Sequence, residues 1–331
     1  MRTRNVIIFL LLFLLLLLLF AVDLAWGSVR IPFDELLAVL SGKGNNAINH
    51  EIIINFRLPK ALTAILAGAG LSVAGLMMQT LFRNPLADPY ILGVSSGASL
   101  GVALALMSAT LLPIAFIASS WGLILAAVIG AALVLLLVIG VSAKVQNAVS
   151  LLIVGIMFGT IASSIVGILQ FFSNPDAIKL FIMWNLGSLS AVNWQQLWIL
   201  FPCIAAGIIL SFSLYQRLNG LLLGENYAKG LGIPLLQTRI WIVLATGILA
   251  GGITAFTGPI AFVGVAIPHI ARGLFRTSLH QILIPTCVLL GAGLILLCDI
   301  ISQIPTYTLP INTISSLFGA PIIIWIIMKR K

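Results

Sequence analysis

Residues 55–101 read NFRLPKALTAILAGAGLSVAGLMMQTLFRNPLADPYILGVSSGASLG, and this stretch decides the fold. Its apolar run from Ala61 to Phe82 has the length of one bilayer crossing, which takes about 20 residues. Glycine, alanine and serine recur through the middle of the run, so neighbouring helices can approach it backbone to backbone. We therefore predict a central membrane helix that other helices cover.

The break after this run has a defined chemistry. Asn84-Pro85 and Asp88-Pro89 each place a good N-cap residue directly before a proline, which suits the first position of a helix. The two pairs are predicted to end one helix and start the next.

The whole string closely resembles the signature of permease subunits of ABC importers for ferric siderophores, haem and vitamin B12. The resemblance continues through GPIAFVGVAIPHIAR (residues 258–272) and LFGAPIIIWII (residues 317–327), and so covers nearly the full length. It implies an all-α polytopic membrane protein with type II ABC importer permease architecture. A single transmembrane permease domain is expected over residues 1–331.

Composition points independently to a membrane protein. Of the 331 residues, 61% are hydrophobic and only 8% are charged, whereas a soluble domain carries roughly 25% charged residues. Mean hydropathy is +1.20. The net charge of +9 would suggest nucleic acid as a partner of a soluble protein, but here the basic residues lie mostly in loops between apolar runs. We expect membrane lipid around the chain and no nucleic acid.

Apolar runs predict about ten crossings. The first, near the N-terminus, is interpreted as a retained helix because it is longer than the core of a typical signal peptide. The expected ranges are 6–26, 61–82, 91–107, 121–141, 151–172, 197–215, 240–256, 260–270, 282–301 and 311–328.

The charges of the loops predict the orientation. Most of the 17 basic residues fall in segments that lie inside if the N-terminus is inside, so the positive-inside rule places both termini in the cytoplasm. LAGAGLSVAG (residues 66–75) resembles LATGILAGG (residues 244–252), and the two are expected to run in opposite directions. This is the pattern of an inverted repeat. The resemblance implies a multi-pass protein of the bacterial cytoplasmic (inner) membrane.

The largest inner segment, residues 216–239, is the candidate for coupling to an ATPase. Leu221 to Lys229 is predicted to form one short helix with Glu225 and Lys229 paired across one turn, followed by a stop at Gly230 and a second short helix from Pro234. The resemblance implies that this loop fits a cleft on the ATPase subunit; the alternative is a merely solvated loop. The coupling candidates are Gly224, Glu225, Ala228, Lys229 and Gly230.

Two further functional positions follow from the resemblance. Arg57 and Lys60, on the outer face, are expected to receive the substrate-binding protein, although they could instead only anchor a helix end in lipid. The family's cytoplasmic gate corresponds to Asn147, Ala148, Val149 and Ser150.

The fifth crossing mixes small and weakly polar side chains that could line a passage. Ordinary helix packing explains the same composition equally well. The path candidates are Phe158, Thr160, Ser163 and Ser164.

No enzymatic site is predicted. The chain contains no GxxxxGK[ST] phosphate loop, so ATP must be used by a partner, and no cofactor is expected. Its three cysteines lack CxxC spacing and its histidines are isolated in sequence, so no metal site is expected. Asp23 and Asp299 are expected at the membrane interface, near helix ends. A buried carboxylate chain is therefore not expected, which argues against the alternative class, an ion-coupled secondary transporter.

The resemblance also implies the assembly and the cargo. Such permeases work as homodimers or pseudo-symmetric pairs with two ATP-binding subunits and an outer substrate-binding protein. A ferric siderophore is the expected substrate, and vitamin B12 and haem remain open.

Overall fold

The computed structural model describes residues 2–27, 29, 31–44, 46–108, 119–142, 148–305 and 307–328. Every regular element in these ranges is a helix.

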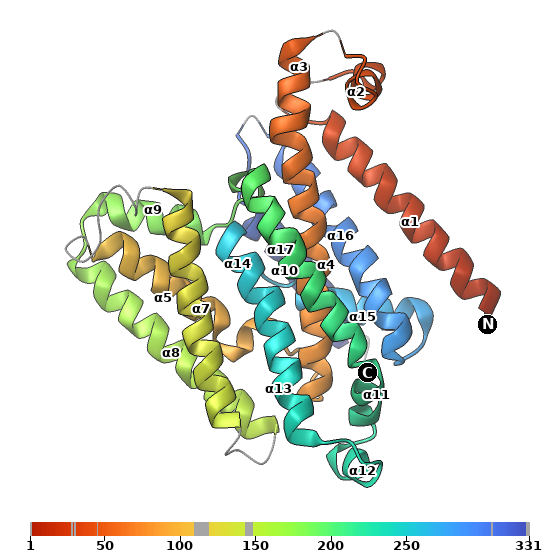
Figure 1. Cartoon of the computed structure of the whole chain (residues 1–331), viewed down its shortest axis with the longest axis vertical. Coiled ribbons are helices and arrows are strands. Elements are labelled where there is room, and N and C mark those ends of the chain that lie inside the picture. The colour runs from red at the N-terminus through yellow and green to blue at the C-terminus, as the bar shows by residue number, and fades with distance from the viewer. Residues whose placement is uncertain are drawn as a thin grey trace.

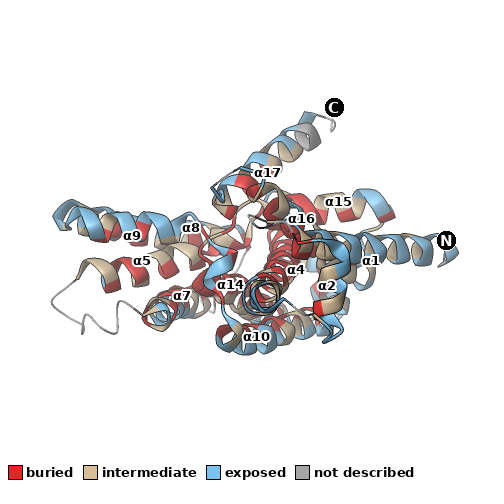
Figure 2. Ribbon diagram, turned by 90° about the horizontal axis from the view of Figure 1, so that it is seen from above, coloured by how far each residue is buried: buried red, intermediate tan, exposed pale blue. Residues whose placement is uncertain are grey.

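Helix α4 (Leu58–Leu81) runs through the middle of the molecule (Figures 1 and 2). α3 (Ala47–Glu51) and a wider π-helical turn, η1 (Ile52–Arg57), lead into it without a break. Every residue from Ala67 to Leu81 is buried. The predicted central helix is thus confirmed, and it begins further toward the N-terminus than the apolar run indicated.

Glycines let two helices contact α4 at backbone distance. A Cβ added to Gly68 would lie 2.0 Å from the carbonyl oxygen of Gly291, and one added to Gly75 would lie 1.9 Å from that of Gly264. These partners belong to α16 (His280–Ser302) and α15 (Val263–Phe275). Any larger side chain at Gly68 or Gly75 would push the helices apart.

Two groups of helices surround α4. The first covers it directly and consists of α1 (Arg2–Ala25), α10 (Trp194–Ser213), α13 (Leu235–Thr246), the π-helical turn η4 (Gly247–Gly251), α14 (Gly252–Thr257), α15 and α16. The second group packs mainly on itself (Figure 1) and consists of α5 (Val94–Met107), α7 (Ser120–Ser142), α8 (Ala148–Phe172) and α9 (Pro175–Asn185). The remaining elements are α2 (Phe33–Leu40), η2 (Pro89–Leu92), η3 (Leu189–Ala191), α11 (Tyr215–Leu222), α12 (Glu225–Gly230) and α17 (Ile311–Met328).

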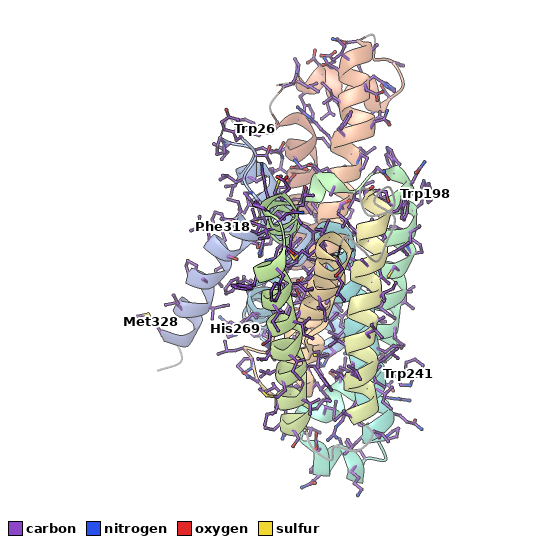
Figure 3. All side chains as sticks on the ribbon, turned by 90° about the vertical axis from the view of Figure 1, so that its left-hand side faces the viewer. Trp26, Trp198, Trp241, His269, Phe318 and Met328 are labelled. Atoms are coloured by element: carbon purple, nitrogen blue, oxygen red, sulfur yellow. The ribbon has the colours of Figure 1, made fainter. Side chains whose placement is uncertain are left out.

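The number of crossings agrees with the prediction. Among the described residues, seven helices are long and apolar enough to cross a membrane, and three shorter apolar helices complete the expected set. Residues 66–75 in α4 and residues 244–252 in α13–α14 run in opposite directions, as predicted (Figure 1). Exposed Trp26 and Trp198 lie toward the end that carries α2, and exposed Trp241 lies toward the α12 end (Figure 3). Tryptophan is enriched at both membrane–water interfaces.

Of the two Asx-Pro pairs predicted to start helices after α4, only Asp88-Pro89 does so. Asp88 caps the short helix η2, and its Oδ1 accepts a hydrogen bond from the Tyr90 amide at 2.9 Å. Asn84 instead closes a turn by accepting from the Leu86 amide at 3.0 Å, and no helix begins at Pro85. Gly93, at a φ of +76°, then redirects the chain into α5.

Candidate functional site

The coupling segment forms two short helices, α11 and α12, divided at Gly224. This residue has a φ of +109° and a ψ of 152°, a conformation open essentially only to glycine. The guanidinium of Arg83 lies against it, with Nη2 2.8 Å from the position of a Cβ on Gly224. The predicted single helix from Leu221 to Lys229 was therefore wrong, because the chain turns sharply in its middle.

The charges of α12 also pair differently from the prediction. Glu225 binds Arg239 on α13 at 2.7 Å, so α12 is tied to a membrane helix, while Lys229 is exposed. Ala228 is completely buried and anchors the short helix. Gly230 is the last residue of α12, where an added Cβ would meet no described atom within 4 Å, and the left-handed stop is Gly232, at a φ of +79°. Pro234 precedes a membrane helix, α13, and not a second short one.

A chain of hydrogen bonds joins α11 to the central helix. The ring of His280, at the start of α16, contacts Asn219 Oδ1 through Nδ1 at 2.8 Å and Thr80 Oγ1 through Nε2 at 2.8 Å. The His280 backbone amide also donates to Asn219 Oδ1 at 2.9 Å. Both His280 and Thr80 are buried. Sequence reasoning missed this link because its three residues are far apart in the chain.

The expected gate lies beside the coupling helices. Ala148, Val149 and Ser150 form the first turn of α8, and Asn147 lies outside the described residues. Ala148 and Val149 line a cavity of about 540 Å³ whose other walls are the end of α4 and residues 223–227. The structure therefore brings the expected gate and the coupling segment to one place.

Thr160, Ser163 and Ser164 lie on the exposed side of α8, whereas the fourth path candidate, Phe158, packs against the core. The opposite side packs on α5 and η2 through residues that recur every three or four positions, among them Gly155 and Gly159. Thr160, Ser163 and Ser164 are exposed, and Phe158 is half-buried. The hydroxyls of Thr160 and Ser164 donate to backbone carbonyls one turn earlier, each at 2.9 Å, so they remain compatible with an apolar surrounding. The exposed side of α8 is weakly polar and free of other described helices.

Arg57 and Lys60 are turned into the protein. The Lys60 ammonium lies 2.8 Å from Asp299 Oδ2 on α16. Arg57 Nη1 donates to the carbonyl oxygens of Leu24 and Ala25 at 2.7 and 2.9 Å, and Nη2 donates to that of Val29. The two cations hold α1 and α16 against α4.

Asp23 and Asp299 lie close to the ends of α1 and α16, as expected, and face the protein interior. Their side chains are buried, and Gln303 Nε2 bridges them with bonds of 3.3 and 3.1 Å. Lys60 supplies the compensating charge that a buried carboxylate requires. The two carboxylates thus form a compact cluster at the α2 end of the helices rather than a chain across them.

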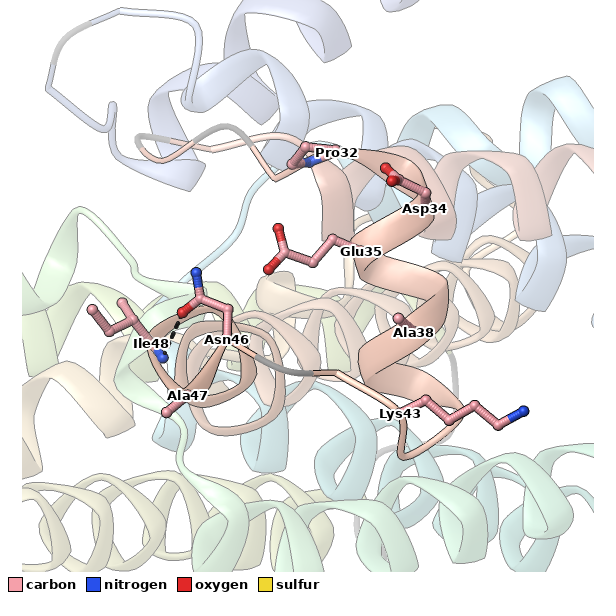
Figure 4. A pocket seen from close by; sticks show the side chains of 8 residues that line it. All are labelled: Pro32, Asp34, Glu35, Ala38, Lys43, Asn46, Ala47 and Ile48. Carbon is pink, nitrogen blue, oxygen red and sulfur yellow. Dashed lines mark hydrogen bonds between the residues drawn. The ribbon is translucent and has the colours of Figure 1, made fainter.

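The α2 end carries a hollow of about 770 Å³ between α2 and α3 (Figure 4). Asp34, Glu35 and Lys43 line it, and Asn46 caps α3 by accepting from the amides of Ile48 and Asn49 at 3.0 and 3.3 Å.

Comparisons with known proteins agree on one family. The profile of the FecCD transport family matches residues 14–329. The vitamin B12 import system permease protein BtuC of Klebsiella pneumoniae subsp. pneumoniae is 36% identical over 296 residues, which are 88% of this chain and 86% of that protein. The protein of the same name from Salmonella typhi is 35% identical over 294 residues, 88% of each chain. A metal-chelate type ABC transporter solved in an inward-facing conformation superposes with a TM-score of 0.85 at 30% identity, over 97% of this chain and 99% of that chain.

Proposed function

Because the chain belongs to the FecCD transport family, we propose that it is the permease subunit of an ABC importer that carries a metal chelate across the bacterial cytoplasmic membrane. The family is one of transport proteins rather than enzymes. We propose a homodimer, two ATP-binding subunits and an outer substrate-binding protein as the assembly, with both termini and α12 on the cytoplasmic side.

The observation that carries the proposal is the physical link between the coupling helices, the expected gate and α4. The Glu225–Arg239 pair ties α12 to α13, and the Asn219–His280–Thr80 chain ties α11 to α4. A displacement of α11 and α12 by an ATPase subunit would therefore be passed to buried helices rather than lost in a loose loop. Glu225, Lys229 and Gly230 would contact the ATPase, while buried Gly224 and Ala228 would hold α12 in position for it. Residues 147–150 would open or close beside them.

Docking of the binding protein on Arg57 and Lys60 carries a condition. Both cations already have partners within the chain, so a carboxylate of the binding protein must exchange with Asp299 or with carbonyl groups of α1. The exposed rim formed by α2 and α3 offers a larger contact surface at the same end (Figures 1 and 4).

We propose an iron chelate, a ferric siderophore, as the cargo. The specific observation for a second candidate, vitamin B12, is the identity of 35–36% to permeases named for its import. Thr160, Ser163 and Ser164 would line the path without binding the cargo tightly. The hydroxyls of Thr160 and Ser164 already donate to carbonyl groups within α8, and a serine hydroxyl such as that of Ser163 is only weakly polar.

The test is uptake into liposomes that contain the permease with its ATPase subunits and binding protein. Radiolabelled ferric siderophore should accumulate only with ATP, and an excess of unlabelled cobalamin should not reduce it. Accumulation of labelled cobalamin alone would transfer the assignment to the second candidate. A complex that binds the ATPase yet accumulates neither ligand would contradict the transport function.

A further inference from the structure

A cavity of about 460 Å³ opens between the end of α4, the end of α11 and α15. Its lining includes two arginine side chains, Arg83 and Arg272, and the side chains of His269 and Gln79. Arg83 stands between this cavity and the one beside the coupling helices, where its guanidinium approaches Gly224. None of the described residues that line it is acidic. The cavity therefore has the composition of a site for an anion.

One of the arginines is held in place by a buried network. The Arg272 guanidinium donates to Gln79 Oε1, and Gln79 Nε2 donates to the carbonyl oxygens of Gly264 and Val265, both at 3.2 Å. Gln79 is only 4% exposed. The positive charge at this wall is consequently fixed before any ligand arrives, so less conformational freedom is lost on binding.

The cavity lies where membrane helices end. α4 ends at Leu81 and α15 at Phe275, and His269 is level with Met328 near the end of α17 (Figure 3). Exposed Arg83, Leu222 and Gly273 form its rim, which thus combines a cation with an apolar side chain. Because the ends of membrane-spanning helices reach the headgroup region, we place the cavity at the depth of the lipid phosphates.

We propose that this cavity binds the phosphate of an anionic phospholipid headgroup. Arginine matches phosphate with several donors in a planar fork, and basic pockets between membrane helices are suited to anionic headgroups. Leu222 would contact the glycerol and the first methylenes of the lipid. The proposed orientation of the chain places this lipid in the cytoplasmic leaflet, and only that assignment rests on the proposed function. The binding itself does not depend on transport. A bound lipid would contact the end of α11, next to the coupling segment.

Lipid retention by the purified full-length permease tests the site. Native mass spectrometry after titration with phosphatidylglycerol or phosphatidylcholine should show preferential retention of phosphatidylglycerol. Arg272→Gln and, separately, Arg83→Gln should each weaken that retention about fivefold, as expected for about 1 kcal/mol per basic residue near an anionic headgroup. Arg276→Gln, with the same charge change directly after α15 but outside the cavity, should retain the lipid like the wild type.

Arg272→Lys separates charge from structure, because it keeps the cation but loses the fork that binds Gln79. It should retain more phosphatidylglycerol than Arg272→Gln. Equal retention of the two lipids by the wild type, or an equal loss in Arg276→Gln and in the two cavity variants, would overturn the proposal. If millimolar inorganic phosphate displaced phosphatidylglycerol, the cavity would be a site for free phosphate and the lipid proposal would be wrong.

Discussion

Gly224 determines the shape of the coupling segment because its backbone conformation excludes other residues and its space is filled by Arg83. A non-glycine residue in such a conformation costs of order 1–3 kcal/mol, and a Cβ would also displace the Arg83 guanidinium. Gly230, by contrast, has an ordinary helical conformation and open space around it. Glycine is therefore required at position 224, and not at position 230, where the sequence suggests the helix stop.

The comparison of Gly224→Ala with Gly230→Ala measures this difference. Gly224→Ala should lower both the stimulation of ATPase activity and uptake, because α12 can no longer meet α11 at the same angle. Gly230→Ala should change neither by more than about twofold, since alanine is the better helix former and strains nothing there. ATPase activity with and without loaded binding protein gives the readout. Equal losses in the two variants would contradict the assignment.

Asp88, the N-cap of η2 after α4, should make the stability of the permease depend on pH. Burial raises the pKa of Asp88 from 3.8 to about 6, against the opposing effect of the hydrogen bond from the Tyr90 amide. The folded state thus holds its proton more tightly than the unfolded state. Stability should fall as pH rises from about 4 to about 6, and the loss is complete above that window.

Asp88→Asn keeps an N-cap acceptor and removes the charge. The variant should melt at a higher temperature than the wild type at pH 7, and the two melting temperatures should converge toward pH 4. Asp88→Ala should instead lose about 0.5–2 kcal/mol through the missing cap. Thermal unfolding of the purified permease across this pH range checks both. An Asp88→Asn variant with the pH profile of the wild type would show that Asp88 does not titrate in this window.

At the scale of the elements, the helices were predictable and their polar links were not. A crossing such as α4 is encoded locally, by the length of an apolar run and by the Asn84-Pro85 and Asp88-Pro89 breaks. The Asn219–His280–Thr80 chain and the pairing of Lys60 with Asp299 depend on which helices become neighbours. The burial of Asp23 and Asp299 was missed for the same reason: both lie near helix ends in sequence, and α1, α4 and α16 converge there and bury them.

The Asn219–His280–Thr80 chain should matter more for coupling than for assembly. Asn219 lies at the more accessible end of this hydrogen-bond chain. Asn219→Ala removes the oxygen that accepts from the backbone amide of His280 and contacts its Nδ1. Because buried donors then lack a partner, stability should fall by about 1–3 kcal/mol. Uptake per ATP hydrolysed should fall further than ATPase activity. Thr286→Val is the matched control, because its hydroxyl donates only to the Ile282 carbonyl within α16. The same uptake per ATP in Asn219→Ala and Thr286→Val would limit the chain to a structural role.

For the whole molecule, the faces of α1 and α8 suggest different surroundings. Exposed side chains along α1 are aliphatic or aromatic from Val6 to Leu18, which suits contact with lipid tails. The exposed side of α8 adds the hydroxyls of Thr160, Ser163 and Ser164. Hydroxyls and small residues are typical of helix–helix contacts or of a passage rather than of a lipid-facing surface. We therefore expect a second copy of the chain to face α8.

Cross-linking between copies tests this arrangement. In a Cys203→Ser background, which leaves only the buried Cys287 and Cys298, Ser163→Cys should form a covalent dimer with a short bifunctional thiol reagent. Ser213→Cys supplies the control: Ser213 is also exposed and lies on α10, which is on the opposite side of the molecule from α17 and away from α8 and α9 (Figure 2). A second copy facing α8 brings two Ser163 positions across one passage and keeps two Ser213 positions far apart. Cross-linking in membranes, analysed by denaturing electrophoresis, should thus give dimers from the α8 variant alone. Dimers of equal yield from both variants would indicate random collision, and dimers from Ser213→Cys alone would place the interface on α10.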